Sequence, residues 1–507
     1  MAADKDMNGT NGTNGTNGIN GINGTNGTTK KAVPESLIPS PPGRSVLRST
    51  DPEELHDLIC IGFGPASLAI ATALHDSIIS KTSGADGSPH EKTPRVAFLE
   101  RQPQFAWHAG MLLPGAKMQI SFLKDMATFR DPRSEFTFLN YLHRRKRLVP
   151  FVNLSTFLPL RAEYDDYLRW CAGWFDDVVS YGQEVVDIVP EKLNGEQEKI
   201  NGFTVRSRNV KTGEITTRKA RHVVIAVGGK PKIPQPLPSN NPHVIHSSRY
   251  SMAIPALLKD KSKNYRVAVV GAGQSAAEIF NDLHSRYPNS NTSLIIRGSA
   301  LRPSDDSPFV NEIFDPDRVD DYYHQPQDIR TEAIALDRST NYGVVRIELL
   351  EHIYTDMYMQ RLREPDEEAW QHRILNHRSI NSVEDVSASG AHPLRLRVQN
   401  STGVFKKNGV MREEILDVDA VVVATGYVRD AHEQMLRHAD HMKPGGSKAD
   451  KKWAVSRDYR VRFEQGAVAD DAGVWLQGCN EQTHGLSDTL LSILAVRGAE
   501  IVESIFG

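Results

Sequence analysis

Two short glycine-rich segments of the chain have the residue types and the setting of phosphate-binding turns. The first, Gly62-Phe63-Gly64-Pro65-Ala66-Ser67, follows the apolar run Leu58–Ile61 and precedes a helical pattern over Leu68–Leu74. In such a unit the first glycine permits a tight turn, the second lets the backbone approach a pyrophosphate, and the helix N-terminus supplies N–H donors. Ser67 stands where a third glycine is usual. The segment therefore predicts a dinucleotide site.

The residue at the end of the next strand indicates which part of a nucleotide the first turn would meet. The apolar run Arg95–Leu99 ends at Glu100, and a carboxylate at this place accepts hydrogen bonds from a ribose diol. Glu100 lies further from Gly62 than the usual spacing of about 20 residues, and we assign the excess to a polar loop around Ser80–Thr93. The alternative is an exposed strand-end carboxylate with no ligand.

A second copy of the unit appears later in the chain. Gly271-Ala272-Gly273-Gln274-Ser275 follows the apolar run Arg266–Val270 and precedes a helical pattern over Ala276–Leu283. The strand after it, Ser293–Ile296, ends at Arg297. A guanidinium pairs with a 2′-phosphate that a carboxylate would repel, so this site is predicted to bind NADPH rather than NADH. A solvated strand-end cation is the alternative reading of Arg297.

Two dinucleotide sites on one chain imply electron transfer between two cofactors. The runs Val223–Val227 and Asp419–Tyr427 each form a buried strand that closes on a glycine, and we interpret them as crossings between a FAD domain and an inserted NADPH domain. The predicted fold class is α/β, with two Rossmann-type dinucleotide-binding domains. A terminal helix beginning near Thr489 is expected from near-helical apolar spacing, with Ser487 or Asp488 as its cap.

Composition and charge exclude several other classes. The 507 residues suit two or three domains, 39% are hydrophobic, and the formal net charge is -3. No nucleic-acid or anionic-membrane partner is expected from this balance. The longest apolar runs are strand-length, far short of the roughly 20 residues that span a bilayer, and no secretory signal pattern is seen. A cytoplasmic protein is expected.

The cysteines exclude one competing flavoenzyme class. Cys60, Cys171 and Cys479 are scattered, without a CxxC pattern, whereas a flavin disulfide reductase needs two closely spaced thiols. No zinc or other metal site is readable. The Asn-Gly-Thr repeats of Met7–Thr29 have almost nothing to bury, so the first residues are expected to form a disordered low-complexity tail.

The order of these features resembles the class B flavin monooxygenases, within them the microbial N-hydroxylating branch, and most closely the fungal L-ornithine N5-monooxygenases. The similarity covers about residues 50 to 505. The Phe-x-Gly-x-x-x-His pattern of the Baeyer–Villiger and dimethylaniline branches is only half kept, at His246–Tyr250. The stretches that carry the resemblance are Phe105–His108, Lys117–Asp125, Asp131–Ser134, Ser307–Glu312, Thr340–Tyr342 and His484–Asp488.

The resemblance implies an activity. In this family NADPH reduces FAD, O₂ then forms a flavin 4a-hydroperoxide, and one oxygen passes to the side-chain amine of L-ornithine. The product, N5-hydroxyornithine, is the first intermediate of hydroxamate siderophore biosynthesis, which serves iron acquisition. The hydroperoxide survives only where water is excluded. No protein nucleophile or metal is required, because the cofactor supplies the hard chemistry. The family also implies a homo-oligomer, a homotetramer.

The resemblance also assigns roles to residues and segments. Lys124 would hold the substrate α-carboxylate with Asn311 beside it, Asn341 would lie near the reacting amine and NADP⁺, and Ser487 would make a further substrate contact. A largely helical substrate-binding segment near 303–375 would be inserted in the NADPH-binding domain. The backbone of Val185 would meet the adenine edge, and the start of the C-terminal helix would meet the isoalloxazine. The implied FAD-binding residues are Gly62, Gly64, Pro65, Ser67, Glu100, Trp107, His108, Met118, Gln119, Val185, His484, Gly485 and Leu486, and the implied NADPH-binding residues are Gly271, Ala272, Gly273, Gln274, Ser275, Arg297, Asn341, Tyr342 and Gly343.

The expected domains follow, and two other functions stay open. A lysine N6-hydroxylase or another class B oxygenase would share the architecture, and a non-catalytic NADPH-sensing flavoprotein would need no amino-acid site. Four substrate residues in family-like stretches tell against the sensor. The expected boundaries are 1–48 for the tail, 52–250 and 410–507 for the two parts of the FAD-binding domain, and 255–405 for the NADPH-binding domain.

Overall fold

The computed structural model describes residues 43–82, 93–193, 198–388, 391–400, 406–407, 410–411, 413–446 and 452–507. Most of the predicted tail and part of the predicted loop around Ser80–Thr93 lie outside these residues. The last residues assigned to the tail are packed against the fold. The Ser45 N–H donates to the Trp174 carbonyl at 3.0 Å, and Leu47 is only 2% exposed within the first core. The boundary of the tail at residue 48 was therefore placed too late.

The first sheet has seven strands and carries the first glycine turn. Its order is β3-β2-β1-β6-β5-β4, and β19 pairs with the C-terminal part of β6. The strands β3, β2, β1, β6 and β19 run parallel, whereas β4, β5 and β6 form an antiparallel meander. The bounds are β1 His56–Ile61, β2 Val96–Glu100, β3 Val179–Tyr181, β4 Gln183–Glu191, β5 Gly202–Asn209, β6 Ile215–Ile225 and β19 Gly473–Leu476.

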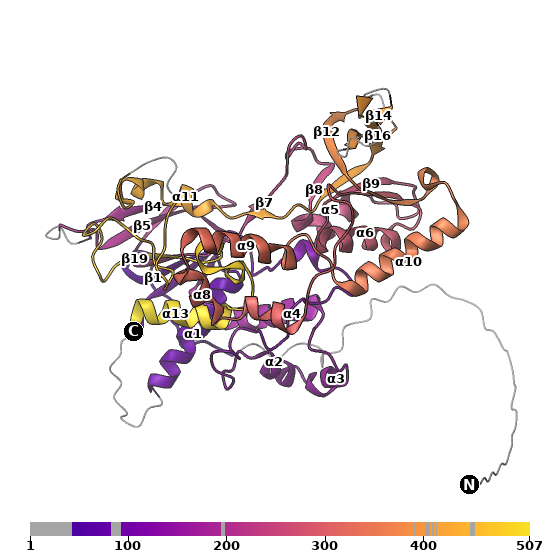
Figure 1. The fold of residues 1–507 in the computed structure, drawn as a ribbon. Helices are drawn as coiled ribbons and strands as arrows, with labels where there is room; N and C mark the ends of the chain where they lie inside the picture. The colour runs from indigo at the N-terminus through magenta and orange to yellow at the C-terminus, as the bar shows by residue number, and fades with distance from the viewer. Residues whose placement is uncertain are drawn as a thin grey trace, which may run out of the picture. The chain divides into compact units, whose positions relative to one another are not determined.

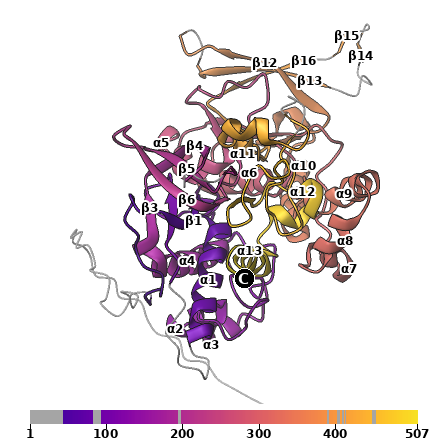
Figure 2. The ribbon, with the colours of Figure 1, turned by 90° about the vertical axis from the view of Figure 1, so that its left-hand side faces the viewer.

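Helices cover this sheet because their apolar residues have nowhere else to be buried. The helix α1 Pro65–Thr82 starts directly at the glycine turn, and its inner residues join a core with the aromatic side chains of the segment 136–175. Figures 1 and 2 show α1 beside the C-terminal helix α13 Leu494–Phe506. The two helices approach closely, since a Cβ added to Gly498 would lie 2.8 Å from the Ala69 backbone. The other helices of this part are α2 Phe138–Arg144, α3 Leu148–Val152 and α4 Arg161–Ala172.

The second sheet has five parallel strands and carries the second glycine turn. Its order is β11-β10-β9-β17-β8. Both faces are buried by separate apolar clusters, as parallel sheets require. The bounds are β8 Val244–His246, β9 Arg266–Val270, β10 Asn291–Ile295, β11 His372–Leu375, β17 Ala420–Val423, α5 Tyr250–Leu257 and α6 Gln274–Arg286.

The remaining elements lie between these strands along the chain. A three-stranded antiparallel sheet, in the order β12-β13-β16, connects β11 to β17. The region 308–363 is largely helical, as the resemblance implied, and its binding of a substrate stays a prediction. The bounds are α7 Pro308–Asn311, α8 Arg318–His324, α9 Gln327–Asn341, α10 Ile347–Arg363, β12 Arg378–Asp385, β13 Leu394–Asn400, β14 Lys406–Lys407, β15 Val410–Met411, β16 Glu413–Val418, α11 Ala431–Met435 and α12 Glu481–His484.

The predicted α/β class with two strand–turn–helix units is confirmed, but the strands are distributed between the two sheets differently from the expected domain bounds. The strands β8 and β17 were expected within the FAD-binding segments 52–250 and 410–507, and both pair in the second sheet. The two crossings between the sheets lie side by side, because β7 Lys230–Pro231 pairs with β18 Tyr427–Val428. Burial alone could not assign these strands, since an apolar run is equally buried in either sheet.

The C-terminal helix also begins later than expected. Leu486–Thr489 forms a single 3-10 turn, and α13 begins at Leu494 rather than near Thr489. Neither Ser487 nor Asp488 caps it. Asp488 instead accepts the Asn480 N–H at 2.7 Å and forms a buried ion pair of 2.8 Å with Arg497. Among the described residues, no helix combines the length and the apolar character needed to cross a membrane.

Candidate functional site

The first glycine turn lies at the carboxyl ends of β1 and β6. Gly62 has a φ of +88°, and a Cβ at this position would lie 2.7 Å from the Ala226 carbonyl oxygen that closes β6. A side chain is therefore excluded by both conformation and space. A Cβ at Gly64 would meet nothing within 4 Å, so the outer side of the turn is open. This geometry fits a backbone that a pyrophosphate approaches.

The carboxylate of Glu100 is part of the turn rather than a free surface group. Its Oε2 accepts the Phe63 N–H at 2.7 Å, its Oε1 accepts the Gln102 N–H at 2.8 Å, and the residue is 8% exposed. The alternative of an exposed carboxylate is thereby excluded. A carboxylate offers about four acceptor sites, so two backbone donors leave capacity for a ribose diol.

Two unpaired polar groups beside this turn test whether a ligand fits. Within the described residues, the Ser67 Oγ and both amide atoms of Gln477 are buried and have no hydrogen-bond partner. Buried polar groups are rarely left unpaired in a folded protein, and a bound nucleotide would supply partners here. Gln477 was missed by the sequence reasoning, although Val474–Leu476 followed by Gln477-Gly478 repeats the pattern of an apolar strand that closes on a glycine.

The second glycine turn repeats the geometry of the first. Gly271 has a φ of +142°, and a Cβ there would lie 2.4 Å from the Ala424 carbonyl oxygen at the end of β17. Gly273 is the N-cap of α6 and would bring a Cβ to 3.4 Å from the Cα of Gly343. The turn and the segment Asn341–Gly343, both predicted to bind NADPH, are therefore adjacent in the fold.

Arg297 lies just beyond the carboxyl end of β10 in the second sheet. It is exposed, and it has no hydrogen-bond or ion-pair partner within the described part of the chain. A guanidinium with five unused donors at the end of this strand is available to a phosphate. Its contact with a 2′-phosphate stays a prediction.

Gln274 uses its side chain to connect three parts of the fold. Its Nε2 donates to Glu278 Oε1 at 2.9 Å, and its Oε1 accepts the Arg346 N–H at 2.9 Å. Arg161, the first residue of α4, donates to both oxygens of Glu278 at 2.8 Å. The Gln274 side chain therefore joins the second turn to the first half of the molecule, and its contact with NADPH stays a prediction.

Two of the predicted substrate residues, Lys124 and Asn311, come from segments that are distant in the chain and lie close together in the fold. The Lys124 ammonium lies 3.7 Å from Asp315, four residues after Asn311, and its side chain is 15% exposed. Asn311 is exposed and its Nδ2 donates to the Asp306 carbonyl at 2.9 Å. Lys124 therefore lies beside the segment that follows Asn311, and the contact of either residue with a substrate stays a prediction.

The other two predicted substrate residues, Asn341 and Ser487, lie on segments that pack together. Leu486 forms a small apolar cluster with Tyr342, Ile313 and Phe314. The Tyr342 hydroxyl donates to Glu481 Oε2 at 2.7 Å and is hydrogen-bonded to Thr489 Oγ1 at 2.9 Å, which fixes the chain next to Asn341. Burial raises the pKa of Tyr342, so the phenol stays protonated and a donor. Ser487 follows Leu486 and is 1% exposed.

The His484 side chain is held inside the fold, and its predicted place near FAD stays a prediction. Its imidazole is fully buried, stacked on Tyr459 at 4.3 Å, and bonded to Thr483 Oγ1 and the Arg457 carbonyl. Burial lowers the pKa of His484 to about 4, so the ring is neutral near pH 7. Any contact of His484 with a cofactor is left to its backbone. Gly485 beside it has no room for a side chain, because a Cβ would lie 2.6 Å from the Tyr322 ring.

The remaining predicted flavin residues come from the segment that follows β2 and from the edge strand β4. Trp107 and His108 form an edge-to-face pair, and the His108 ring lies 6.0 Å from that of Tyr427 on the crossing strand β18. His246, from the half-kept motif, donates its Nε2–H to the Gly426 carbonyl at 3.0 Å, and its ring lies 5.2 Å from that of Tyr427. His108 and His246 therefore both lie beside Tyr427, where the chain crosses between the two sheets. Met118 is 4% exposed, Gln119 is exposed, and Val185 lies on the edge strand β4 and is 6% exposed.

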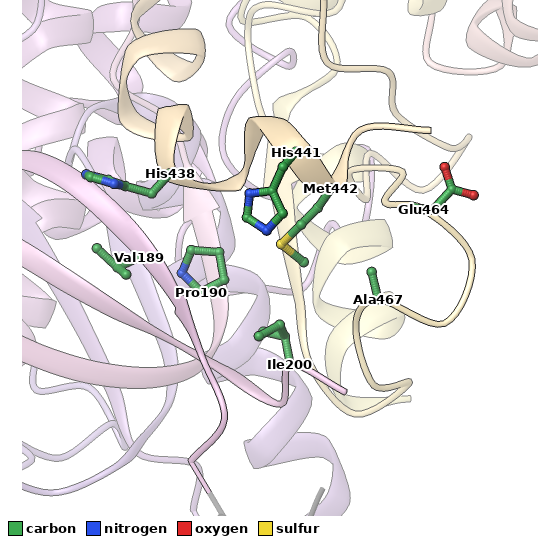
Figure 3. Close-up of a pocket in the computed structure, with 8 residues that line it drawn as sticks. All are labelled: Val189, Pro190, Ile200, His438, His441, Met442, Glu464 and Ala467. Atoms are coloured by element: carbon green, nitrogen blue, oxygen red, sulfur yellow. The ribbon is translucent and has the colours of Figure 1, made fainter. Parts of the chain in front are cut away.

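A cavity of about 450 Å³ opens elsewhere, between β4 and the segment 438–467. Figure 3 shows the His441 ring and the Met442 thioether pointing towards Pro190 and Ile200. None of the predicted site residues lines it, and it contains no glycine turn. Its walls are Val189, Pro190, Ile200, His438, His441, Met442, Glu464 and Ala467.

Comparisons with known proteins agree with this geometry. The sequence pattern of the family described as L-lysine 6-monooxygenase/L-ornithine 5-monooxygenase matches residues 54–429. An L-ornithine N(5)-monooxygenase from Cochliobolus heterostrophus is 58% identical over 489 residues, which cover 94% of this chain and 91% of that protein. An L-ornithine N(5)-monooxygenase from Emericella nidulans is 56% identical and covers 91% of each chain.

Solved structures give the same result. The ornithine hydroxylase PvdA from Pseudomonas aeruginosa matches with a TM-score of 0.76 and 35% identity, over 89% of this chain and 99% of that one. The ornithine N-hydroxylase KtzI of Kutzneria sp. 744, described with reduced FAD, NADP⁺ and L-ornithine, matches with a TM-score of 0.75, 35% identity and the same coverage. Both the fold and the sequence therefore point to one group of enzymes.

Proposed function

Because the chain belongs to the L-lysine 6-monooxygenase/L-ornithine 5-monooxygenase family, we propose that it hydroxylates the side-chain amine of L-ornithine, with FAD, NADPH and O₂. The resemblance drawn from the sequence is confirmed by this membership. The product would be N5-hydroxyornithine, the first intermediate of a hydroxamate siderophore. The observation that carries the proposal is the proximity of Lys124 to Asp315 in the helical region 308–363.

The two glycine turns divide the cofactors between them. The first turn has the acceptor and donors that fit FAD, because Glu100 lies in it and because Ser67 and Gln477 have no hydrogen-bond partner among the described residues. The second turn fits NADPH, because Arg297 has no partner in the described part of the chain. When bound, the pair of cofactors supplies hydride transfer and oxygen activation. The first sheet would then form the FAD-binding domain and the second sheet the NADPH-binding domain.

The residues of the chain orient the substrate and exclude water. Lys124 supplies a positive point charge for the α-carboxylate of an amino acid. Asp315, 45% exposed, holds that ammonium in place until a second carboxylate competes for it. The Tyr342–Glu481–Thr489 hydrogen bonds fix the Asn341 segment. The apolar cluster around Leu486 keeps water out of the space between them.

The length of the substrate decides whether its amine reaches the reacting oxygen. If Lys124 binds the α-carboxylate at one end, ornithine presents its amine at a fixed distance, and lysine is one methylene longer. We expect ornithine to give hydroxylamine product and lysine at most to stimulate NADPH oxidation with release of peroxide. Hydroxylamine formed from lysine at a comparable rate would assign the chain to lysine hydroxylation instead.

A matched pair of lysine variants tests the substrate site. Lys124→Ala should raise the KM for ornithine by roughly 10- to 100-fold, as expected for a charge-assisted contact of about 1.5–3 kcal/mol, and should leave flavin reduction by NADPH unchanged in stopped flow. Lys117→Ala removes the same charge from an exposed position in the same stretch and should change neither. A Lys124→Ala enzyme that reduces flavin slowly but binds ornithine normally would place Lys124 at the nucleotide instead.

The cofactor and the assembly have separate tests. The purified protein should be yellow and should release FAD on denaturation, whereas release of FMN alone would contradict the first site. A homotetramer and a cytoplasmic location stay predictions from the sequence, to be checked by sedimentation and by cell fractionation.

A further inference from the structure

The helix α10 has one face packed in the core and an opposite face that is apolar and exposed. Ile353 and Met357 are buried in the cluster that includes α6. On the other side, Tyr354 is 73% exposed, Tyr358 52% and Leu362 62%. Figure 1 shows α10 at the edge of the fold. An exposed Phe, Tyr or Leu by itself is ordinary, but three on one helix form a patch.

Helical geometry makes these residues a continuous stripe. Positions 354, 358 and 362 are spaced by four, so they lie above one another on the same side of the helix. Ile347, 50% exposed, extends the stripe to the first turn. The 17 residues of α10 span about 26 Å at 1.5 Å per residue. Contiguous apolar stripes of this kind, rich in Tyr, are typical of protein interfaces.

The charges beside the stripe divide along the helix. Glu351 lies in the N-terminal half, and Arg361 and Arg363 lie at the C-terminal end. Within the described residues, neither Glu351 nor Arg363 has an ion-pair partner, and Arg361 only covers the Trp370 ring at 5.3 Å. Two such helices in antiparallel orientation would place the acidic half of each opposite the basic half of the other.

We propose that α10 is the centre of a two-fold interface between two copies of this chain. The stripes pack antiparallel about an axis near Asp356, which brings Tyr354 of one copy against Tyr358 of the other and Glu351 towards Arg361. A two-fold interface uses the same patch on both subunits and must be complementary to itself, and the α10 face satisfies this condition in the order of its charges. A predicted oligomer does not specify its surface, so the proposal goes beyond the proposed function.

A second copy fits this face better than a membrane does. Helices that lie on an anionic bilayer combine their apolar face with Lys and Arg on the polar face, whereas α10 carries Glu348, Glu351 and Asp356 beside its arginines. An unrelated protein would not need the acidic and basic halves to match in reverse order. The antiparallel self-complementarity therefore selects a copy of the same chain.

The size of the stripe predicts how the interface is built. A stable interface buries roughly 800 Å² per partner, more than one helical face about 26 Å long offers. Neighbouring segments must add contacts, and the tyrosines at the centre should carry most of the binding free energy. A single charge placed there should separate the subunits.

Sedimentation velocity of the FAD-loaded full chain over a range of concentrations tests the proposal. Tyr354→Glu should halve the size of the assembly, or raise its dissociation constant at least 100-fold, and leave flavin content and flavin reduction unchanged. Val149→Glu introduces the same charge at a position that is 71% exposed on α3 and should leave the assembly intact. A wild-type chain that is monomeric at every concentration would overturn the proposal, as would dissociation caused by Val149→Glu and not by Tyr354→Glu.

A charge exchange tests the antiparallel arrangement itself. Glu351→Arg and Arg361→Glu should each weaken the assembly about 10-fold or more, because each places like charges together across the axis. The variant with both changes should recover the wild-type dissociation constant. A double variant as weak as the single variants would contradict the pairing of these two residues.

Discussion

The two glycine turns have the same backbone arrangement, but the residue at the end of the neighbouring strand is an acid in the first, Glu100 after β2, and a base in the second, Arg297 after β10. In each turn the first glycine lies against a carbonyl oxygen that closes another strand of its sheet, Ala226 beside Gly62 and Ala424 beside Gly271. In the first, Glu100 is buried and hydrogen-bonded to the turn itself. In the second, Arg297 is exposed and unpaired among the described residues.

Glu100 and Arg297 should therefore differ in what they contribute to folding and to ligand binding. Glu100 both supports its turn and offers capacity to a ligand, so its loss should disturb folding and binding together. Arg297 supports nothing else that the described structure shows, so its loss should affect only the ligand with the matching phosphate.

The glycines themselves should give the largest effects, and different ones. Gly62→Ala and Gly271→Ala each place a Cβ within 2.7 Å or less of a backbone oxygen at positive φ, at a cost of roughly 2–5 kcal/mol. Gly62→Ala should yield protein with little bound FAD. Gly271→Ala should keep its flavin and lose at least 100-fold in kcat/KM for NADPH.

Flavin content measured by absorbance and reduction measured by stopped flow separate these two results. Gly213→Ala is a suitable control, because it also has a positive φ but its Cβ meets nothing within 4 Å. Loss of flavin from the Gly271→Ala variant would contradict the division of cofactors between the turns.

Glu100→Ala should have an intermediate effect on two properties at once. The Phe63 and Gln102 N–H groups lose a charged acceptor, which costs roughly 1.5–3 kcal/mol for each charge-assisted bond. Both the melting temperature of the apoprotein and the affinity for FAD should fall. An apoprotein that melts as the wild type does would show that Glu100 acts on the ligand alone.

Arg297→Ala should change one property only. Removal of a charge-assisted pair with a 2′-phosphate costs roughly 1.5–3 kcal/mol, so kcat/KM for NADPH should fall by about 10- to 100-fold. The value for NADH and the melting temperature should hardly change. Equal losses with both coenzymes would mean that the 2′-phosphate is bound elsewhere.

The smallest effect concerns acid stability. His284 on α6 and His372 on β11 stack at 3.6 Å and share Thr292 as hydrogen-bond partner. Burial, and for His284 also the neighbouring His372, holds both pKa values well below the ordinary value of 6.5. In the first sheet, burial lowers the pKa of His222 to about 4.

The sign of the pH effect follows from these shifts. The unfolded chain binds protons on these histidines below about pH 6.5, while the folded chain does not, so stability is lost as pH falls from 6.5 towards 4. Each histidine should cost about 1 kcal/mol between pH 7 and 5.5. Thermal unfolding against pH should be less steep for His284→Phe, and equally less steep for His222→Phe. An unchanged slope in either variant would show that the folded ring binds its proton as readily as the unfolded chain does.

The sequence alone determined the local units of this protein. The turns at Gly62 and Gly271, and the strands and helices on either side of each, were predicted from neighbouring residues and appear at those places. They could be predicted because the tight turn, the helix N-terminus and the buried strand all depend on interactions within about 20 residues. The helical segment that contains Asn311 and Asn341 followed from the resemblance.

The tertiary structure alone decided which distant groups meet. Apolar spacing reports that a residue is buried but not what buries it, so β8 and β17 were assigned to the wrong sheet. The start of α13 was placed too early because Asp488, a good cap in sequence, is taken by Asn480 and Arg497. The contacts of Lys124 with Asp315 and of Gln274 with Arg346 join residues far apart in the chain. Such partners are selected by packing and charge in the folded molecule.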